Sequence, residues 1–182
     1  IPVQLASVTD GIGKQVVVAF EPLTAPNVHT RHPTPPRHPV TEIRGAMYVL
    51  TQLNVTDGVG GMHQTVFHYT GGQYHLLGLG FLGFHRVSST DVLTGLITHS
   101  NYTQDYKQRL QNQMMETLTV APDMTVVENK TWVHNVTIES YQGLDGLWYP
   151  TFQITTPLVY WEKHGLLGEW LSASVTATLQ YD

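Results

Sequence analysis

The sequence contains no cysteine and little charge. None of its 182 residues is Cys, and only 13% are Asp, Glu, Lys or Arg, about half the usual share. The absence of Cys excludes disulfides and thiol chemistry, which in a secreted protein argues against small disulfide-stapled scaffolds and favours a prokaryotic surface protein. A chain of this length can bury a core without such staples, so we expect residues 1–182 to form a single β domain.

Basic residues and long apolar runs are also scarce. Nine Lys and Arg stand against fourteen Asp and Glu, giving a net charge of −5, so nucleic acid is not expected as a partner. The longest strongly apolar run, 76–84, contains three glycines and is too short to span a membrane as a helix. The chain opens on Ile1-Pro2 rather than Met, as after removal of a signal peptide, which predicts an extracellular or cell-surface location.

Recognisable catalytic motifs are absent as well. The sequence has no Gly-x-Ser-x-Gly elbow, no phosphate-cradling loop and no His-Glu-x-x-His helix, and its acidic residues are too scattered to suggest a carboxylate pair. We therefore expect no enzyme activity, no catalytic residue and no cofactor. The segments 10–13 and 57–61 resemble calcium or phosphate loops, but they lack the necessary ligands and are interpreted as turns.

Histidine, by contrast, occurs ten times. The weak metal candidates are His29, His32 and His38 in a Pro/His-rich loop at 22–40, because imidazole commonly binds zinc, copper and nickel. A second cluster comprises His63, His68 and His75. Neither cluster offers a His-x-His pair with a nearby carboxylate, so no metal is predicted. The loop is interpreted as an extended connection whose rings pack on neighbouring surface.

Alternating apolar and polar residues predict many strands. The pattern is clearest in 43–55, 125–141 and 171–181, and further candidates are 14–21, 62–69, 73–87, 92–98 and 149–162, with Gly71-Gly72 as a tight hairpin turn. In one segment, about 103–118, apolar residues recur every four positions, which predicts an amphipathic helix. The whole indicates a mainly β protein: a single-domain β-sandwich of jelly-roll type with one helix, or alternatively a partly open β-barrel.

Four Asn-x-Thr motifs predict N-linked glycans, at Asn54, Asn101, Asn129 and Asn135. The phase of the predicted strands places Asn54, Asn129 and Asn135 on solvent-facing sides. Asn101 instead lies where the predicted helix begins, and there the glycan competes with helix capping.

Two apolar features are candidates for subunit contact. Leu77, Leu79 and Phe81 belong to a run that is apolar on both strand faces, so they lie either in a core or at a contact. At the chain start, Ile1, Val3 and Leu5 alternate with other residues in a strand at 1–9, which a flexible 10–13 segment follows. This strand could be donated to a neighbouring subunit, or it could pair within its own domain.

The processed start at Ile1, the N-terminal strand 1–9, the lack of Cys and the four Asn-x-Thr motifs resemble secreted β-sandwich subunits of prokaryotic surface filaments, such as archaeal bundling pili and TasA-type biofilm fibres. The resemblance implies a homo-polymer, built by donor-strand exchange, that serves adhesion or biofilm cohesion. An alternative is a secreted carbohydrate-binding module that stacks sugars on Trp and Tyr side chains. A third is a His-metal extracellular enzyme.

Overall fold

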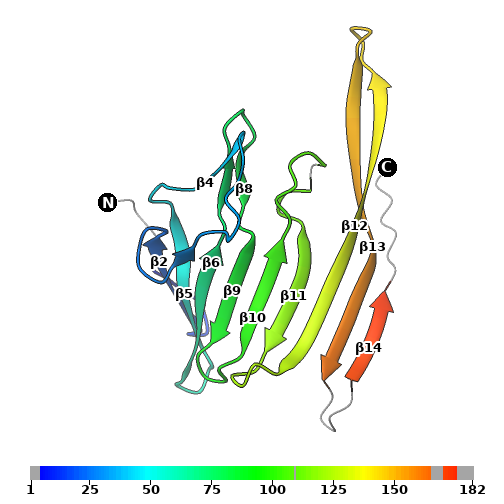
Figure 1. Cartoon of the computed structure of the whole chain (residues 1–182). Coiled ribbons are helices and arrows are strands. Elements are labelled where there is room, and N and C mark those ends of the chain that lie inside the picture. Colours follow the sequence, from blue (N-terminus) through cyan, green and yellow to red (C-terminus); the bar gives the residue numbers. More distant parts are fainter. Residues whose placement is uncertain (1–4, 109, 165–169, 176–182) are drawn as a thin grey trace.

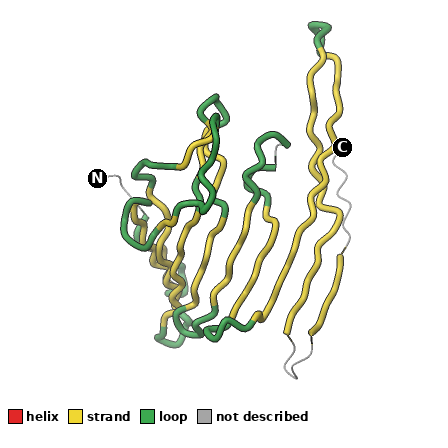
Figure 2. Tube along the Cα trace, viewed as in Figure 1, coloured by secondary structure: helices red, strands yellow, loops and turns green. Residues whose placement is uncertain are grey.

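The protein is an all-β structure of two sheets. The computed structural model describes residues 5–108, 110–164 and 170–175, which contain strands and loops and no helix (Figure 2). The mainly β prediction is therefore confirmed, and the two sheets are consistent with the predicted β-sandwich. The strands are β1 (Ser7–Thr9), β2 (Gln15–Pro22), β3 (His29–Thr30), β4 (Val40–Glu42), β5 (Tyr48–Thr56), β6 (Met62–Thr70), β7 (Gln73–His75), β8 (Gly80–Gly83), β9 (Arg86–Asp91), β10 (Ile97–Tyr102), β11 (Met114–Val120), β12 (Val126–Gln142), β13 (Trp148–His164) and β14 (Trp170–Val175).

The large sheet is an antiparallel meander. Its strand order is β1-β2-β5-β6-β9-β10-β11-β12-β13-β14, and β3 pairs with β6 in parallel (Figure 1). The small sheet has the order β4-β7-β8. In the described part of the chain the large sheet does not close on itself, since β1 and β14 stand at its two ends. This up-and-down order differs from the Greek-key order that the predicted jelly-roll type requires.

Aspartate side chains fix three of the tight turns. The carboxylate of Asp10 accepts hydrogen bonds from the N–H groups of Ile12 and Lys14, and Asp57 accepts from Val59 and Gly61. Both segments are therefore turns, as predicted. Asp91 caps a third turn in the same way, through the N–H groups of residues 93 and 94, which is why β10 begins at Ile97 rather than at residue 92.

The predicted helix at about 103–118 is wrong. Asp105 caps a turn over residues 107 and 108, Asn112 has a positive φ of 64°, and β11 begins at Met114. From there to Val120 the chain is extended and pairs with β10. The four-residue spacing of apolar side chains was misleading because sheet pairing overrides local helical periodicity, and the threonines of this segment favour a strand.

The predicted strand 73–87 is in fact a hairpin followed by the start of β9. β7 and β8 pair in the small sheet, and Leu77, Leu79 and Phe81 are all exposed. Interpreting these three residues as core is therefore wrong, whereas a role in subunit contact stays a prediction. Leu82, between the glycines of β8, is fully buried.

Gly71 and Gly72 connect the two sheets. The predicted hairpin at this point is wrong, because β6 pairs with β5 and β9 while β7 pairs with β4 and β8. Gly71 has a φ of +66°, and a Cβ atom there would lie 3.0 Å from the Cβ of His85 and 3.1 Å from His32. Only glycine fits this conformation and this close approach.

The described part of the N-terminal strand pairs within its own chain. Ser7 is opposite Val17 in the β1–β2 ladder, and the 10–13 segment is the turn of this hairpin. Leu5 is exposed. Ile1 and Val3 lie outside the described residues, so donation of the strand to a neighbour stays a prediction for them.

The hydrophobic core occupies one end of the large sheet. Leu23, Val28, Val49 and Tyr69 form its buried cluster, against which Phe84 and other partly buried residues pack. The described residues of β12, β13 and β14 contribute no buried hydrophobic side chain. Nor do the described residues include a helix that is long and apolar enough to cross a membrane. Within the described residues, the β12–β14 part of the sheet is thus a single layer.

A two-stranded arm extends beyond this layer. We call residues 135–155 the arm: β12 and β13 pair here from Asn135–Thr155 to Gln142–Trp148, joined by a turn (Figure 1). β11 pairs with β12 only up to Thr131, and β14 pairs with β13 only from Val159 onward. Within the described residues both outer edges of the arm therefore carry no strand.

Candidate functional site

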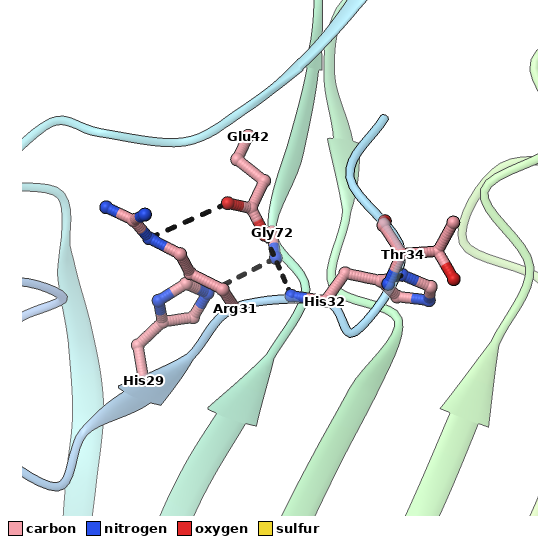
Figure 3. Close-up of polar contacts among 6 residues, drawn as sticks. All are labelled: His29, Arg31, His32, Thr34, Glu42 and Gly72. Atoms are coloured by element: carbon pink, nitrogen blue, oxygen red, sulfur yellow. Dashed lines mark hydrogen bonds and ion pairs between the residues drawn. The ribbon is translucent and has the colours of Figure 1, made fainter. Parts of the chain in front are cut away.

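Polar side chains gather where the Pro/His-rich loop crosses the connection between the two sheets. We call His29, Arg31, His32, Glu42, His68 and His85 the histidine junction. β3 brings His29 beside Tyr69 of β6, and β4 ends on Glu42. Strands that are distant in sequence thus assemble the junction, and the close-up in Figure 3 shows its central residues.

Glu42 anchors the loop. One of its carboxylate oxygens accepts a hydrogen bond from the His32 N–H at 2.8 Å, and the other lies 3.7 Å from Nε of Arg31 (Figure 3). The guanidinium is largely exposed, so water weakens this ion pair. The hydrogen bond to the His32 backbone fixes the path of the loop more firmly than the ion pair does.

Each histidine of the junction has partners of its own. The N–H of Gly72 donates to Nε2 of His29 at 3.4 Å, which leaves the proton of the neutral ring on Nδ1. His32 contacts the N–H and carbonyl of Thr34, and its ring meets that of His85 edge-on at 4.7 Å. His68 bonds the hydroxyl of Thr30 and the carbonyl of Asn27.

Burial favours the neutral forms of two of these rings. Burial is the main cause that lowers the pKa of His29, and nearby His68 and Arg31 lower it further while Glu42 opposes them. Burial also lowers the pKa of His85, with His32 and Arg86 adding to the effect. Protonation of either ring therefore works against the packing of the loop on the sheets.

This arrangement predicts a loss of stability in mild acid. Because the folded-state pKa values of His29 and His85 lie below the unfolded value, the unfolded chain binds more protons as the pH falls below about 6.5, and the free energy of unfolding decreases. We expect a lower Tm at pH 5 than at pH 7.5 in thermal scans followed by circular dichroism.

The control for this effect is His63→Gln, which changes an exposed histidine of β6. The pH dependence should persist in His63→Gln and should become shallower in the double variant His29→Gln/His85→Gln; part of it should remain, because burial, with Arg86 nearby, also lowers the pKa of His99. An equally steep dependence in the double variant would contradict the assignment to these two rings.

The predicted metal candidates do not converge. His29 bonds the backbone of Gly72, His32 bonds Thr34, and His38 is exposed. In the described part of the chain no group of three or more His, Asp or Glu residues is arranged to hold a metal ion. What sequence reasoning missed is Glu42, whose contacts depend on sheet pairing and carry no local signal.

The predicted glycosylation sites differ in accessibility. Asn135 is exposed, whereas Asn54 is half-buried and accepts a hydrogen bond from Gln52. The amide nitrogen of Asn101 donates to Glu116 at 2.7 Å, and its oxygen accepts from Arg86. The side-chain oxygen of Asn129 is buried, so the expectation that Asn129 faces solvent is wrong for this atom. Glycan attachment itself stays a prediction, and exposure favours Asn135.

A cleft of about 340 Å³ opens beside the histidine junction. His29 and Arg31 line one part of the cleft. Arg44, which lies in the segment after β4, also lines it. Its other polar side chains are Thr24 and Asn27. The cleft thus combines two guanidinium groups with neutral hydrogen-bonding groups, in a chain whose net charge is −5.

The fold and these sites define a mainly β protein with an open sheet. A family model described as the insecticide toxin TcdB middle/N-terminal region matches residues 2–115, which is more than half of the chain. The chain belongs to this family. The match includes the histidine junction and the strands through β10, and the arm lies beyond it. No curated protein sequence matches the chain.

Proposed function

We propose that the chain is a structural subunit of an insecticidal-toxin-type assembly and that it associates with further copies of itself through the free edge of β12 in the arm. The proposal gives the chain no catalytic step, and it retains the extracellular location and the N-linked glycans expected from the sequence. The family match supports the class of assembly. The large exposed area and the unpaired edge of β12 support the association between copies of the chain.

The observation that carries the proposal is the exposed area. The chain of 20.3 kDa exposes 12098 Å². A compact monomer of this mass exposes about 8,800 Å², so the excess is about 3,300 Å². A stable interface between two proteins buries about 1,600 Å² in total. An excess of this size can supply such an interface, and within the described residues the exposed side chains of β12–β14 contribute to it.

The arm in particular needs a partner. Ile138 and Trp148 are 62% and 66% exposed, and Leu144 and Leu147 in the turn are exposed as well. An isolated two-stranded hairpin is marginally stable in water, whereas a third or fourth strand makes such a ribbon stable. The unpaired N–H and C=O groups along a free edge are a template for that addition.

The hydrogen-bonding phase of the arm distinguishes its two edges. Gly143 N–H donates to the Leu147 carbonyl at the turn. Because bonded pairs alternate along an antiparallel ladder, Tyr141–Tyr149 is a bonded pair and Ser140–Pro150 is a non-bonded pair. The backbone groups of Ile138 and Ser140 therefore point outward from β12. On β13 the outward position opposite Ser140 is Pro150, which has no N–H to offer, so β12 is the more complete edge.

A twofold pairing of two β12 edges is compatible with the charges of the arm. When the twofold axis passes through Ile138, Glu139 of each copy lies opposite Thr137 of the other. When it passes through Glu139, the two carboxylates face each other, which is unfavourable. We therefore favour the register centred on Ile138. It produces a closed dimer, so growth into a filament needs a second contact, for which the N-terminal strand stays a prediction.

Hydrogen exchange measured at two protein concentrations tests this proposal. At the higher concentration we expect slower exchange in peptides covering 136–142, because the outward N–H groups of β12 become hydrogen-bonded. Peptides from the β5–β6 region serve as the internal reference and should not change. Equal exchange in the arm at both concentrations would contradict pairing at this edge.

The exposed aromatic residues of the arm support a second candidate, carbohydrate binding. Tyr141 and Tyr149 lie side by side with ring centres 5.7 Å apart. Trp148, which precedes Tyr149 in β13, is also exposed. Exposed aromatic rings can stack on sugar rings. A chain that stays monomeric and binds glycans, with binding lost in Trp148→Ala, would favour this function over self-association.

A further inference from the structure

The cleft beside the histidine junction has the chemistry of an anion site. Its two charged side chains are Arg31 and Arg44, and within the described residues Arg44 makes no ion pair. Arg31 is only partly neutralised by Glu42, since their contact is a single one at 3.7 Å. The cleft is therefore lined by two guanidinium groups, of which only that of Arg31 contacts a carboxylate, and this leaves the cleft positive.

The neutral groups of the cleft are hydrogen-bond donors or can become donors. Nε2 of His29 accepts a hydrogen bond from the N–H of Gly72. In the neutral ring the proton is therefore on Nδ1, which can donate it in a hydrogen bond. Figure 3 shows this ring and its hydrogen bond with Gly72, and it shows the contact of Arg31 with the Glu42 carboxylate. Thr24 and Asn27 add a hydroxyl and an amide. The volume of about 340 Å³ is in the range of small-molecule sites.

We propose that this cleft binds the oxyanion group, a sulfate, phosphate or carboxylate, of a small anionic ligand. Arg31 and Arg44 neutralise the charge, and the planar guanidinium groups match two oxygens of such a group at once. His29 donates a further hydrogen bond. The cleft lies next to β3 and β4, away from the arm, so this inference is independent of the proposed self-association.

The test uses sodium sulfate, sodium phosphate and sodium acetate as separate probes on the whole chain, with ionic strength held constant by KCl. NMR follows the Nε–H signals of the arginines. We expect the Arg31 and Arg44 signals to shift and saturate with at least one probe, and the strongest probe identifies the preferred oxyanion. Shifts that rise without saturation for all three probes would overturn the inference.

Variants locate the site. Arg44→Gln should weaken binding by about tenfold or more, because it removes a charge-assisted hydrogen bond. Arg37→Gln is the matched control: it removes an exposed arginine of the Pro/His-rich loop that lines a different cleft, and it should leave binding unchanged. Arg44→Lys keeps the charge and should bind with intermediate strength. If Arg44→Gln binds like the unchanged chain, or if Arg37→Gln is the variant that loses binding, the assignment to this cleft is overturned.

Discussion

Ser140→Pro is expected to abolish most of the self-association of the chain. Ser140 belongs to a non-bonded pair of the arm, so its N–H points outward and the arm itself does not use it. Proline removes this donor and places its ring on the free edge of β12. In a twofold dimer the change occurs twice, so the loss of two hydrogen bonds of about 1 kcal/mol each weakens the dimer by about 30-fold or more.

Two matched variants make this result specific. Ser140→Ala keeps the backbone N–H and should associate like the unchanged chain. Pro150→Ala restores a donor on the opposite edge and should not weaken association. Dimerisation of Ser140→Pro with unchanged affinity, measured by sedimentation velocity, would show that the free edge of β12 is not the contact.

Tyr69→Ala is expected to cause the largest loss of stability. Tyr69 is buried among Leu23, Val28 and Val49, its ring meets that of Phe84 at 4.7 Å, and its hydroxyl donates to the Leu50 carbonyl at 2.7 Å. Removing a buried aromatic side chain costs about 3–5 kcal/mol, through lost burial and the remaining cavity. That is a large part of the 5–15 kcal/mol typical of a domain.

The matched variants separate the ring from the hydroxyl. Tyr69→Phe keeps the ring and should lower the free energy of unfolding by about 1 kcal/mol, because only one hydrogen bond is lost. Tyr74→Ala removes an exposed tyrosine of β7 and should change stability by less than about 0.5 kcal/mol. Urea unfolding followed by fluorescence measures all three. A loss in Tyr69→Ala no larger than that in Tyr74→Ala would mean that the core does not depend on this cluster.

Much of the strand content could be predicted from local alternation. The segments 14–21, 62–69, 125–141 and 149–162 coincide with β2, β6, β12 and β13 to within two residues at every end. Their apolar and polar residues alternate because each strand has two unlike faces. The aspartate-capped turns at 10–13 and 57–61 were equally local, since a carboxylate and the N–H groups two and four residues later suffice to make them.

Errors arose where a distant segment decides the local structure. The 103–118 segment has helical spacing, yet β10 supplies pairing partners for Met114–Val120 and the chain extends. Gly71-Gly72 looks like a hairpin turn, but the strands on either side pair with other strands and the glycines cross between sheets. Such pairings are not encoded within any short window of the sequence.

The candidate sites depend on distant contacts to an even greater degree. Glu42 and Arg31 meet only because β4 and β3 are held by β7 and β6. Likewise, alternation predicted the strands of the arm, but its protrusion follows from where β11 and the described part of β14 stop pairing with β12 and β13. Predicting that the backbone N–H of Ser140 points outward also requires the hydrogen bond from the Gly143 N–H to the Leu147 carbonyl in the turn.

The most direct test of the central claim is the sedimentation velocity of the unchanged chain over a range of concentrations. The account predicts a second species of about twice the mass of the 20.3 kDa polypeptide, whose fraction rises with concentration and falls in Ser140→Pro. A single species with the mass of one chain at every concentration would contradict it.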